Sequence, residues 1–282
     1  MEGRTKVKKT QSFGKIMLYV TLIIASLLAV FPFYWMFVMA TNPSHLINQT
    51  PPVVIPGTEL VRNFQNVMAN VDFFGAFKNS FIVSISVTIG TLFLCSLAGF
   101  AFAKLDFPWK KFWFAAILVT MMVPPQLGLI PQYFIITELG WLSDLRAVIV
   151  PGLINAFGIF WMRQYIKDSI PDALIEAGKI DGCSTFRMYW NVVVPAIAPA
   201  FATLGIIVFM NVWNDFLWPL VVLQDSASHT LQVALRSLND SYVNDYGMIM
   251  SGTLWATAPL IAIFLLFNRF FINSLTQGAV KG

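Results

Sequence analysis

Polar residues interrupt an apolar stretch near residue 211, and they carry the groups of this sequence best suited to chemistry. Four of them follow the i, i+3, i+4, i+7 spacing of one helix face, namely Asn211, Asn214, Asp215 and Trp218, and Trp213 lies among them. Amides and carboxylates hydrogen-bond hydroxyl groups, and an indole covers the apolar face of a sugar ring. An ionisable side chain inside a membrane span usually faces the bundle interior or a water-filled cavity. This face therefore indicates either a substrate path for a sugar or polar contacts between helices at a subunit interface.

The sequence offers no catalytic or metal-binding constellation. It contains no Gly-x4-Gly-Lys-Ser/Thr phosphate loop, so the chain has no visible means of binding ATP. His45 and His229 stand outside any HExxH or Cys/His spacing, and Cys95 and Cys183 give no disulfide or metal pattern. We therefore expect a protein that is not an enzyme and that binds no metal or cofactor of its own.

The composition is that of a membrane protein. Hydrophobic residues make up 57% and charged residues 11% of the 282 residues, and the mean hydropathy is +0.70. A helix needs roughly 20 mostly apolar residues to cross a bilayer, and only helices fit runs that lack the alternation of a barrel strand. We predict an all-α polytopic membrane protein with six transmembrane helices, at residues 16–40, 80–103, 112–130, 147–162, 193–223 and 248–272. Proline inside several runs predicts kinks, at Pro32, Pro124, Pro125, Pro199, Pro219 and Pro259.

The distribution of Lys and Arg sets the orientation. With six spans and a cytoplasmic N-terminus, fourteen of the 18 basic residues lie on the cytoplasmic side. The other four are Arg62, Lys78, Arg146 and Arg236. The positive-inside rule then places both termini in the cytoplasm. The net charge of +4 is explained by this topology and requires no nucleic acid. We expect a basic tail over 1–15, one membrane domain over 16–272 and a C-terminal tail over 273–282.

The segment 169–195, SIPDALIEAGKIDGCSTFRMYWNVVVP, is too polar to span the membrane but is patterned as two short helices. Ser169 and Asp172 have capping-box spacing, which predicts the start of the first helix. One face of that helix would carry Ile170, Leu174, Ala177 and Gly178. Asp181-Gly182 predicts the turn that ends it. A second amphipathic stretch would then align Phe186, Tyr189, Trp190 and Val193 on one stripe before Pro195.

This segment resembles the cytoplasmic loop of the permease subunits of binding-protein-dependent ABC importers, which reads Glu-Ala-Ala, three residues, Gly, nine residues, Ile-x-Leu-Pro. The positions in that register are Glu176, Ala177, Gly182 and Pro195, with Val192 and Val194 for Ile and Leu and Gly178 where the family usually has Ala. The resemblance implies a coupling helix seated in a groove of a separate ATPase, where Glu176 pairs with a basic residue and where Gly178 and Asp181 belong to the contact. Without the resemblance, an amphipathic helix on the membrane surface is the alternative.

The resemblance extends over nearly the whole chain and favours the carbohydrate, maltose-type branch, in particular its second permease subunit. The stretches that carry it are LVRNFQNV, AGFAFAKLDF, MMVPPQLGLIPQYFI, WNDFLWPL and the tail NRFFINSLTQGAVKG. It implies alternating access in the cytoplasmic (inner) membrane of a bacterium or archaeon. The implied partners are a homologous second permease, two ATPase subunits that use ATP and Mg, an extracytoplasmic sugar-binding protein, the sugar itself and membrane lipid.

The resemblance also limits what this chain is expected to touch. In the maltose-type branch the membrane sugar site belongs chiefly to the partner permease. By position, the loop with Asn239, Asp240, Tyr242 and Asn244 is expected to contact the binding protein. Disaccharides, longer oligosaccharides, polyols and glycerol phosphate all remain compatible as cargo. From the residues alone, a secondary transporter is the main alternative, although we find no inverted repeat, and a purely structural membrane protein is another.

Overall fold

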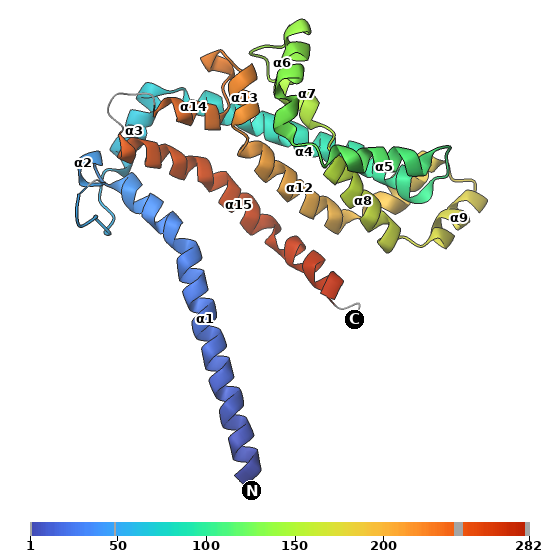
Figure 1. Cartoon of the computed structure of the whole chain (residues 1–282), viewed down its shortest axis with the longest axis horizontal. Helices are drawn as coiled ribbons and strands as arrows, with labels where there is room; N and C mark the ends of the chain where they lie inside the picture. Colours follow the sequence, from blue (N-terminus) through green and yellow to red (C-terminus); the bar gives the residue numbers. More distant parts are fainter. Residues whose placement is uncertain (1, 48, 240–244, 280–282) are drawn as a thin grey trace. The chain divides into compact units, whose positions relative to one another are not determined.

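The computed structural model describes residues 2–47, 49–239 and 245–279, and it describes side chains within these ranges from residue 14 to residue 266 (Figure 1). Every regular element in this part of the chain is a helix. The helices fall into two compact units, Met1–Asn70 with Leu238–Trp255 and Val71–Ser237 with Ala256–Gly282. The last helix, α15 (Tyr246–Ala279), begins in the first unit and continues in the second.

The first unit contains the long N-terminal helix and a polar junction at its end. The N-terminal helix is α1 (Glu2–Thr41), and it is followed by α2 (Ser44–Ile47) and α3 (Leu60–Asn70). Asn63 Nδ2 on α3 donates to Ala40 O at 2.8 Å and to Asn42 O at 3.1 Å, which satisfies carbonyls left free where α1 ends. Ser44 hydrogen-bonds Asp245, and Phe64 packs on Trp255 with 5.4 Å between ring centroids.

The second unit is built around α4 (Phe73–Lys104). The remaining elements are α5 (Lys110–Thr120), η1 (Pro125–Gly128), α6 (Leu129–Glu138), α7 (Arg146–Gly152), α8 (Ala156–Ser169), α9 (Asp172–Ile180), α10 (Thr185–Met188), η2 (Tyr189–Val193), α11 (Val194–Ala196), α12 (Ala198–Trp213), α13 (Leu217–Val222), η3 (Ser226–Ser228) and α14 (Leu231–Ser237).

Helices α8 and α12 pack along α4, which buries small residues at helical spacing, including Ser84, Thr91 and Ser96. Such residues let helix backbones approach closely in a membrane, where the hydrophobic effect does not drive helices together. Gly99 is the closest point, because an added Cβ would lie 2.8 Å from Arg163 N and 2.8 Å from Met162 Cβ on α8.

The count of membrane spans agrees with six only if two bent pairs are each taken as one span. Four helical segments are long and apolar enough to cross a membrane, namely Gly14–Thr41, Phe73–Lys104, Arg146–Ser169 and Tyr246–Leu266. The pair Lys110–Thr120 and Pro125–Glu138 is bent by 94°, and the pair Thr185–Ala196 and Ala198–Trp213 by 79°. The all-α polytopic prediction is therefore confirmed, and the count lies between four and six by length and composition.

Proline residues lie at both bends, and they explain the first one. Pro124 precedes η1 and Pro125 is its first residue, and a ring without an N–H cannot continue the helical hydrogen bonds from α5. Pro199 stands in the first turn of α12, a position that proline tolerates. Pro32 and Pro259 lie inside α1 and α15, whose helices continue through them. The predicted third span is thus a bent pair rather than one straight helix.

Candidate functional site

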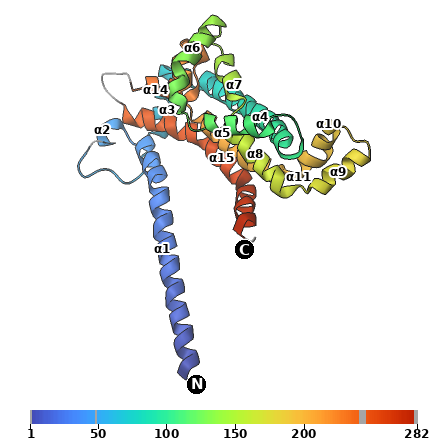
Figure 2. The same ribbon diagram turned by 45° about the vertical axis from the view of Figure 1, so that its right-hand side comes forward.

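The segment 169–195 forms short helices, as predicted, but its first helix begins differently. Ser169 is the last residue of α8, so it does not cap α9, and the predicted capping box is wrong. Pro171 stands at the N-cap position of α9 without a side-chain hydrogen bond. The carboxylate of Asp172 instead accepts a hydrogen bond from Lys104 Nζ, at 2.6 Å. Figure 2 shows α9, α10 and α11 together beyond the end of α8.

The turn after α9 is confirmed. Gly182 has φ +73°, the left-handed conformation that a residue without Cβ adopts at little cost. Its N–H donates to Lys179 O at 3.1 Å, and Cys183 N–H donates to Gly178 O at 2.9 Å. Asp181, which precedes it, ends the helix. The local pattern of acidic residue and glycine was therefore sufficient to locate this turn.

The faces of α9 differ from the predicted arrangement. Ile170 is buried, whereas Leu174 is 48% exposed, so the two do not share one environment. Ile175 is the residue of α9 that is buried in the core. Gly178 faces Met188 of the same chain, because an added Cβ would lie 3.1 Å from Met188 Sδ. Its small size serves internal packing on α10.

The outer face of α9 is an exposed surface with an apolar component. Glu176 and Ala177 are exposed, and Ile180 is 86% exposed. Among the described residues, no ion pair involves Glu176. The side chains of Glu176 and Ile180 are therefore both open to solvent in this chain. We call Leu174, Glu176, Ala177 and Ile180 the α9 outer face.

The second half of the loop anchors to the core. Ser184 caps α10 by accepting from Arg187 N–H at 3.3 Å. Tyr189 is buried, and its hydroxyl lies 2.7 Å from Ser96 Oγ on α4. The predicted single stripe is wrong, because Tyr189 and Val193 are buried while Phe186 and Trp190 are exposed. Residues Tyr189–Val193 form a π-helix, whose wider turn changes the positions that an α-helical spacing predicts. Pro195 follows in α11 and is exposed.

The ion pair between Lys104 and Asp172 fixes the position of α9. The Lys104 side chain is only 3% exposed, whereas that of Asp172 is 81% exposed. The hydrogen bond from Lys104, and then its positive charge, hold the pKa of the Asp172 carboxyl below its ordinary value. The carboxylate therefore remains ionised and paired at neutral pH.

The predicted polar face at residues 211–218 is not one helix face. Helix α12 ends at Trp213, and residues 214–216 separate it from α13. Asn211 and Asn214 are exposed, and Asn214 Nδ2 donates back to Met210 O at 2.8 Å. Adjacent Asn and Asp side chains compete for backbone hydrogen bonds, which favours a turn over a continued helix.

The two tryptophans of this segment have structural hydrogen bonds. Trp213 is buried, and its Nε1–H donates to Ala256 O at 3.1 Å. Trp218 is also buried, and its Nε1–H donates to Ala147 O at 3.0 Å. Both indoles therefore hold neighbouring helices of this chain together, and the prediction of a contact at a subunit interface stays a prediction. Trp218 also borders a pocket.

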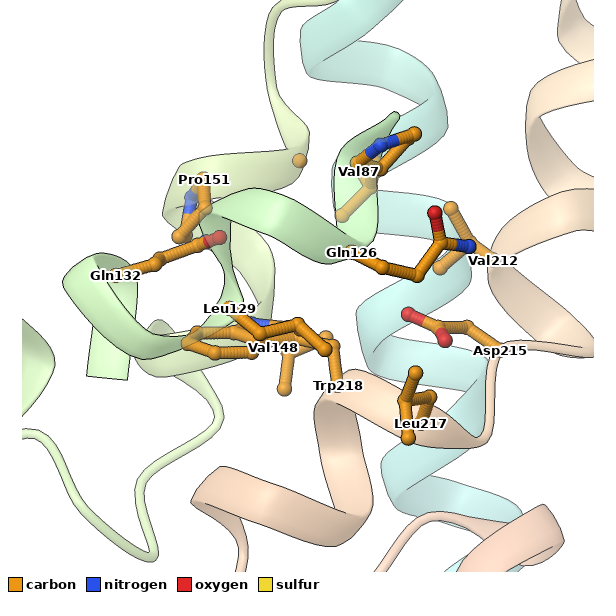
Figure 3. Close-up of a pocket in the computed structure, with 12 residues that line it drawn as sticks. Val87, Gln126, Leu129, Gln132, Val148, Pro151, Val212, Asp215, Leu217 and Trp218 are labelled. Atoms are coloured by element: carbon orange, nitrogen blue, oxygen red, sulfur yellow. The ribbon is translucent and has the colours of Figure 1, made fainter. Parts of the chain in front are cut away.

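That pocket has a volume of about 300 Å³ and lies where several helices are interrupted (Figure 3). Gln126 and Asp215 come from the two breaks, η1 and the link before α13, and they point toward the same space, while Gln132 on α6 lies on the other side near Pro151. The lining also includes Val87, Leu129, Val148, Gly152, Val212, Leu217 and Trp218. The glutamines were not expected at a site, because neither belongs to the polar run near residue 211.

The predicted contact loop for a binding protein is described only at its edge. Asn239 is exposed in the turn after α14. Asp240, Tyr242 and Asn244 lie outside the described residues. Closer to α4, Asn79 Nδ2 donates to Ala227 O at 3.0 Å and to His229 O at 3.1 Å, and Leu231 N–H donates to Ser80 Oγ at 2.7 Å. This ties the segment around η3 to the start of α4.

Comparison with known proteins identifies the family. Residues 95–277 match the family described as binding-protein-dependent transport system inner membrane component. The arabinooligosaccharides transport system permease protein AraQ of Halalkalibacterium halodurans is 30% identical over 98% of this chain and 99% of its own length. The lactose transport system permease protein LacG of Rhizobium radiobacter is 34% identical, covering 94% of this chain and 96% of that protein. The sn-glycerol-3-phosphate transport system permease protein UgpE of Yersinia enterocolitica is 30% identical, covering 93% of this chain and 96% of that protein.

The fold agrees with a solved transporter. One chain in a crystal structure of a bacterial ABC transporter involved in the import of the acidic polysaccharide alginate superposes with a TM-score of 0.79, at 22% identity, over 93% of this chain and 97% of that chain. Together with the long apolar helices, the family match over residues 95–277 gives one conclusion. The chain belongs to the family of inner membrane components of binding-protein-dependent transport systems.

Proposed function

We propose that this chain is a permease subunit of an ATP-driven, binding-protein-dependent sugar importer. The observation that carries the proposal is similarity at 30% identity over 98% of the chain to a permease protein named for arabinooligosaccharides transport. A relative named for lactose transport supports the same class of cargo. A second candidate cargo is sn-glycerol 3-phosphate, because a permease protein of that transport system is also 30% identical.

The α9 outer face is the surface that the ATPase would contact in order to displace α9. It offers a free carboxylate at Glu176 and an aliphatic side chain at Ile180, which is 86% exposed. The inner side of the helix is held by Ile175, which is buried in the core. A helix that is packed on one side and exposed on the other moves as a body with the elements that hold it.

The proposed cycle is alternating access. Closure of an ATPase dimer that uses ATP and Mg would displace α9, and α4 would follow through the Lys104–Asp172 pair and the Tyr189–Ser96 hydrogen bond. The other components are a homologous second permease, two copies of the ATPase and an external sugar-binding protein. Both termini would be cytoplasmic, as the distribution of basic residues favours.

A pull-down in mild detergent tests the proposal. Wild type is compared with Glu176→Lys, and Glu138→Lys is the matched control, since Glu138 is an exposed glutamate at the end of α6. Mass spectrometry should recover an ATPase, a second permease and a binding protein with wild type and with the control. Glu176→Lys should lose the ATPase. If the chain purifies alone and transports solute into liposomes without ATP, it is a secondary carrier and the proposal is wrong.

A further inference from the structure

We infer that the pocket around Gln126, Gln132 and Asp215 is a subsite of the transport path that binds the hydroxyl groups of an uncharged saccharide. This inference rests on the proposed importer function and adds a direct contact between this chain and the cargo. It differs from the sequence-based prediction, because its donors and acceptors come from α6, η1 and the link before α13 rather than from one face of α12.

The position of the pocket is the first argument. Three helix interruptions meet there, between α5 and α6, between α7 and α8, and between α12 and α13. The first contributes Gln126 and the third Asp215, and Gly152 is the last residue of α7 before the second. Each interruption leaves backbone N–H and C=O groups without helical partners. At membrane depth such backbone is tolerated only where protein covers it or where it lines a water-filled cavity.

The side chains are the second argument. Two amides supply donors and acceptors, and the Asp215 carboxylate supplies strong acceptors, while Leu129 and Leu217 supply apolar surface. Convergent polar groups on an apolar wall are typical of a small-molecule site, and 300 Å³ is at the small end of such sites. Figure 3 shows Gln126 and Asp215 directed into one space. The Asp215 carboxylate also accepts hydrogen bonds from the backbone N–H groups of residues 216–218.

The rigidity of the wall is the third argument. Trp218 is held by its hydrogen bond to Ala147 O, and the carboxylate of Asp215 lies beside the backbone N–H groups that begin α13. Groups held in place before the ligand arrives lose little conformational entropy on binding. A weak, preorganised subsite suits a transport path, where a solute must enter and also leave.

The charge of the lining decides the class of cargo. Asp215 is its ionisable side chain, and no lysine or arginine lines the described pocket. A phosphate or carboxylate group would be desolvated there beside a like charge and without a cation. A neutral sugar meets no such cost, because its hydroxyls donate to the carboxylate and accept from the glutamine amides.

Water access is the first test. Gln126→Cys and Gln132→Cys are treated in membranes with a hydrophilic, membrane-impermeant methanethiosulfonate, with wild type giving the background from Cys95 and Cys183. Ile24→Cys, in the middle of the apolar helix α1, is the reference for an inaccessible site. Both glutamine positions should be labelled in at least one state of the ATP cycle. Labelling no greater than at Ile24→Cys would overturn the inference.

Transport is the second test. The assembled importer, with the binding protein recovered in the pull-down, is reconstituted in vesicles and offered radiolabelled arabinotriose, lactose and sn-glycerol 3-phosphate. Gln132→Leu should lower the rate of saccharide uptake about twofold to tenfold, as expected for one neutral hydrogen bond. Asp215→Asn keeps the shape and should lower it about tenfold or more, as expected for a charged acceptor. The exposed Gln65→Leu on α3 is the matched control and should transport normally.

The outcomes separate the inference from the importer function. If both pocket variants transport a saccharide as fast as Gln65→Leu does, the subsite is wrong and the importer function stands. If wild type imports sn-glycerol 3-phosphate and no saccharide, the uncharged-cargo inference is wrong. If wild type shows no ATP-dependent uptake of any of the three, the importer function itself fails. Retained stimulation of ATP hydrolysis in the pocket variants distinguishes lost cargo contact from misfolding.

Discussion

Lys104 Nζ lies 2.6 Å from Asp172 Oδ1, so the last residue of the central helix α4 is joined to the first residue of α9. The lysine side chain is covered while the aspartate is exposed to solvent, and exposed ion pairs contribute little to stability. The main role of this contact is therefore to position α9. It holds the helix that carries the α9 outer face against the helix around which the second unit is built.

Breaking this pair should uncouple the importer without unfolding it. Lys104→Met retains the apolar stem, and Asp172→Asn retains the shape, so expression and ATPase recovery should stay near wild type. Transport per ATP hydrolysed should fall about twofold to tenfold, because α9 can then move without α4. The measurement is simultaneous uptake and ATP hydrolysis in vesicles.

The neighbouring pair provides the control for that experiment. Asp106 and Lys110 lie 3.6 Å apart, and the Asp106 side chain is fully exposed, so Asp106→Asn removes a similar charge without touching α9. Asp106→Asn should leave the transport per ATP hydrolysed unchanged. The exchange Lys104→Asp with Asp172→Lys should recover part of the coupling. Equal coupling in Lys104→Met, Asp172→Asn and wild type would contradict a positioning role.

Acid should weaken the same contact only at low pH. The hydrogen bond from Lys104 lowers the pKa of Asp172 below its ordinary value of 3.8. A carboxylate with a lowered pKa in the folded state contributes stability above 3.8 and loses it as the pH falls through the folded-state pKa. The difference in Tm between wild type and Asp172→Asn, measured in detergent, should be constant from pH 7 to pH 5 and vanish below the ordinary value. A difference that disappears already between pH 7 and pH 5 would refute this assignment.

The turn at Gly182 should be sensitive to proline. Gly182 has φ +73°, and its N–H donates to Lys179 O, whereas proline has φ near −65° and no N–H. Gly182→Pro should therefore leave the protein inserted but reorient α10 against α9, and ATPase recovery should fall severalfold. Gly140→Pro is the matched control, since Gly140 also has positive φ, +65°, in the link after α6. Equal loss of ATPase in both variants would indicate general damage instead.

The crossing of α4 and α8 should not tolerate a larger residue at Gly99. A Cβ there would lie 2.8 Å from Arg163 N, and neither backbone can yield without separating the helices. Gly99→Ala should destabilise the protein by about 1–3 kcal/mol, the usual cost of overpacking. Gly14→Ala, where no atom lies within 4 Å of the added Cβ, should not destabilise the protein, because alanine also favours a helix more than glycine does. Denaturant or thermal unfolding in detergent measures both, and equal stability of the two variants would contradict this packing.

The sequence by itself determined the features that depend on local composition and short spacing. Long apolar runs require helices in lipid, so the all-α membrane fold followed directly. The register from Glu176 to Pro195 identified the loop that forms α9 and α10, and the Asp181-Gly182 pair located the turn between them. These properties are carried by neighbouring residues and need no knowledge of distant contacts.

Only the tertiary structure decided which distant residues meet. A helical spacing assumes an unbroken helix, so it could not show that α12 ends at Trp213 or that Ser169 belongs to α8. Gln126 and Asp215 come together because two interrupted helices pack side by side, and Lys104 reaches Asp172 because α8 returns along α4. Such contacts arise from the packing of whole helices, so the periodicity within one segment does not predict them.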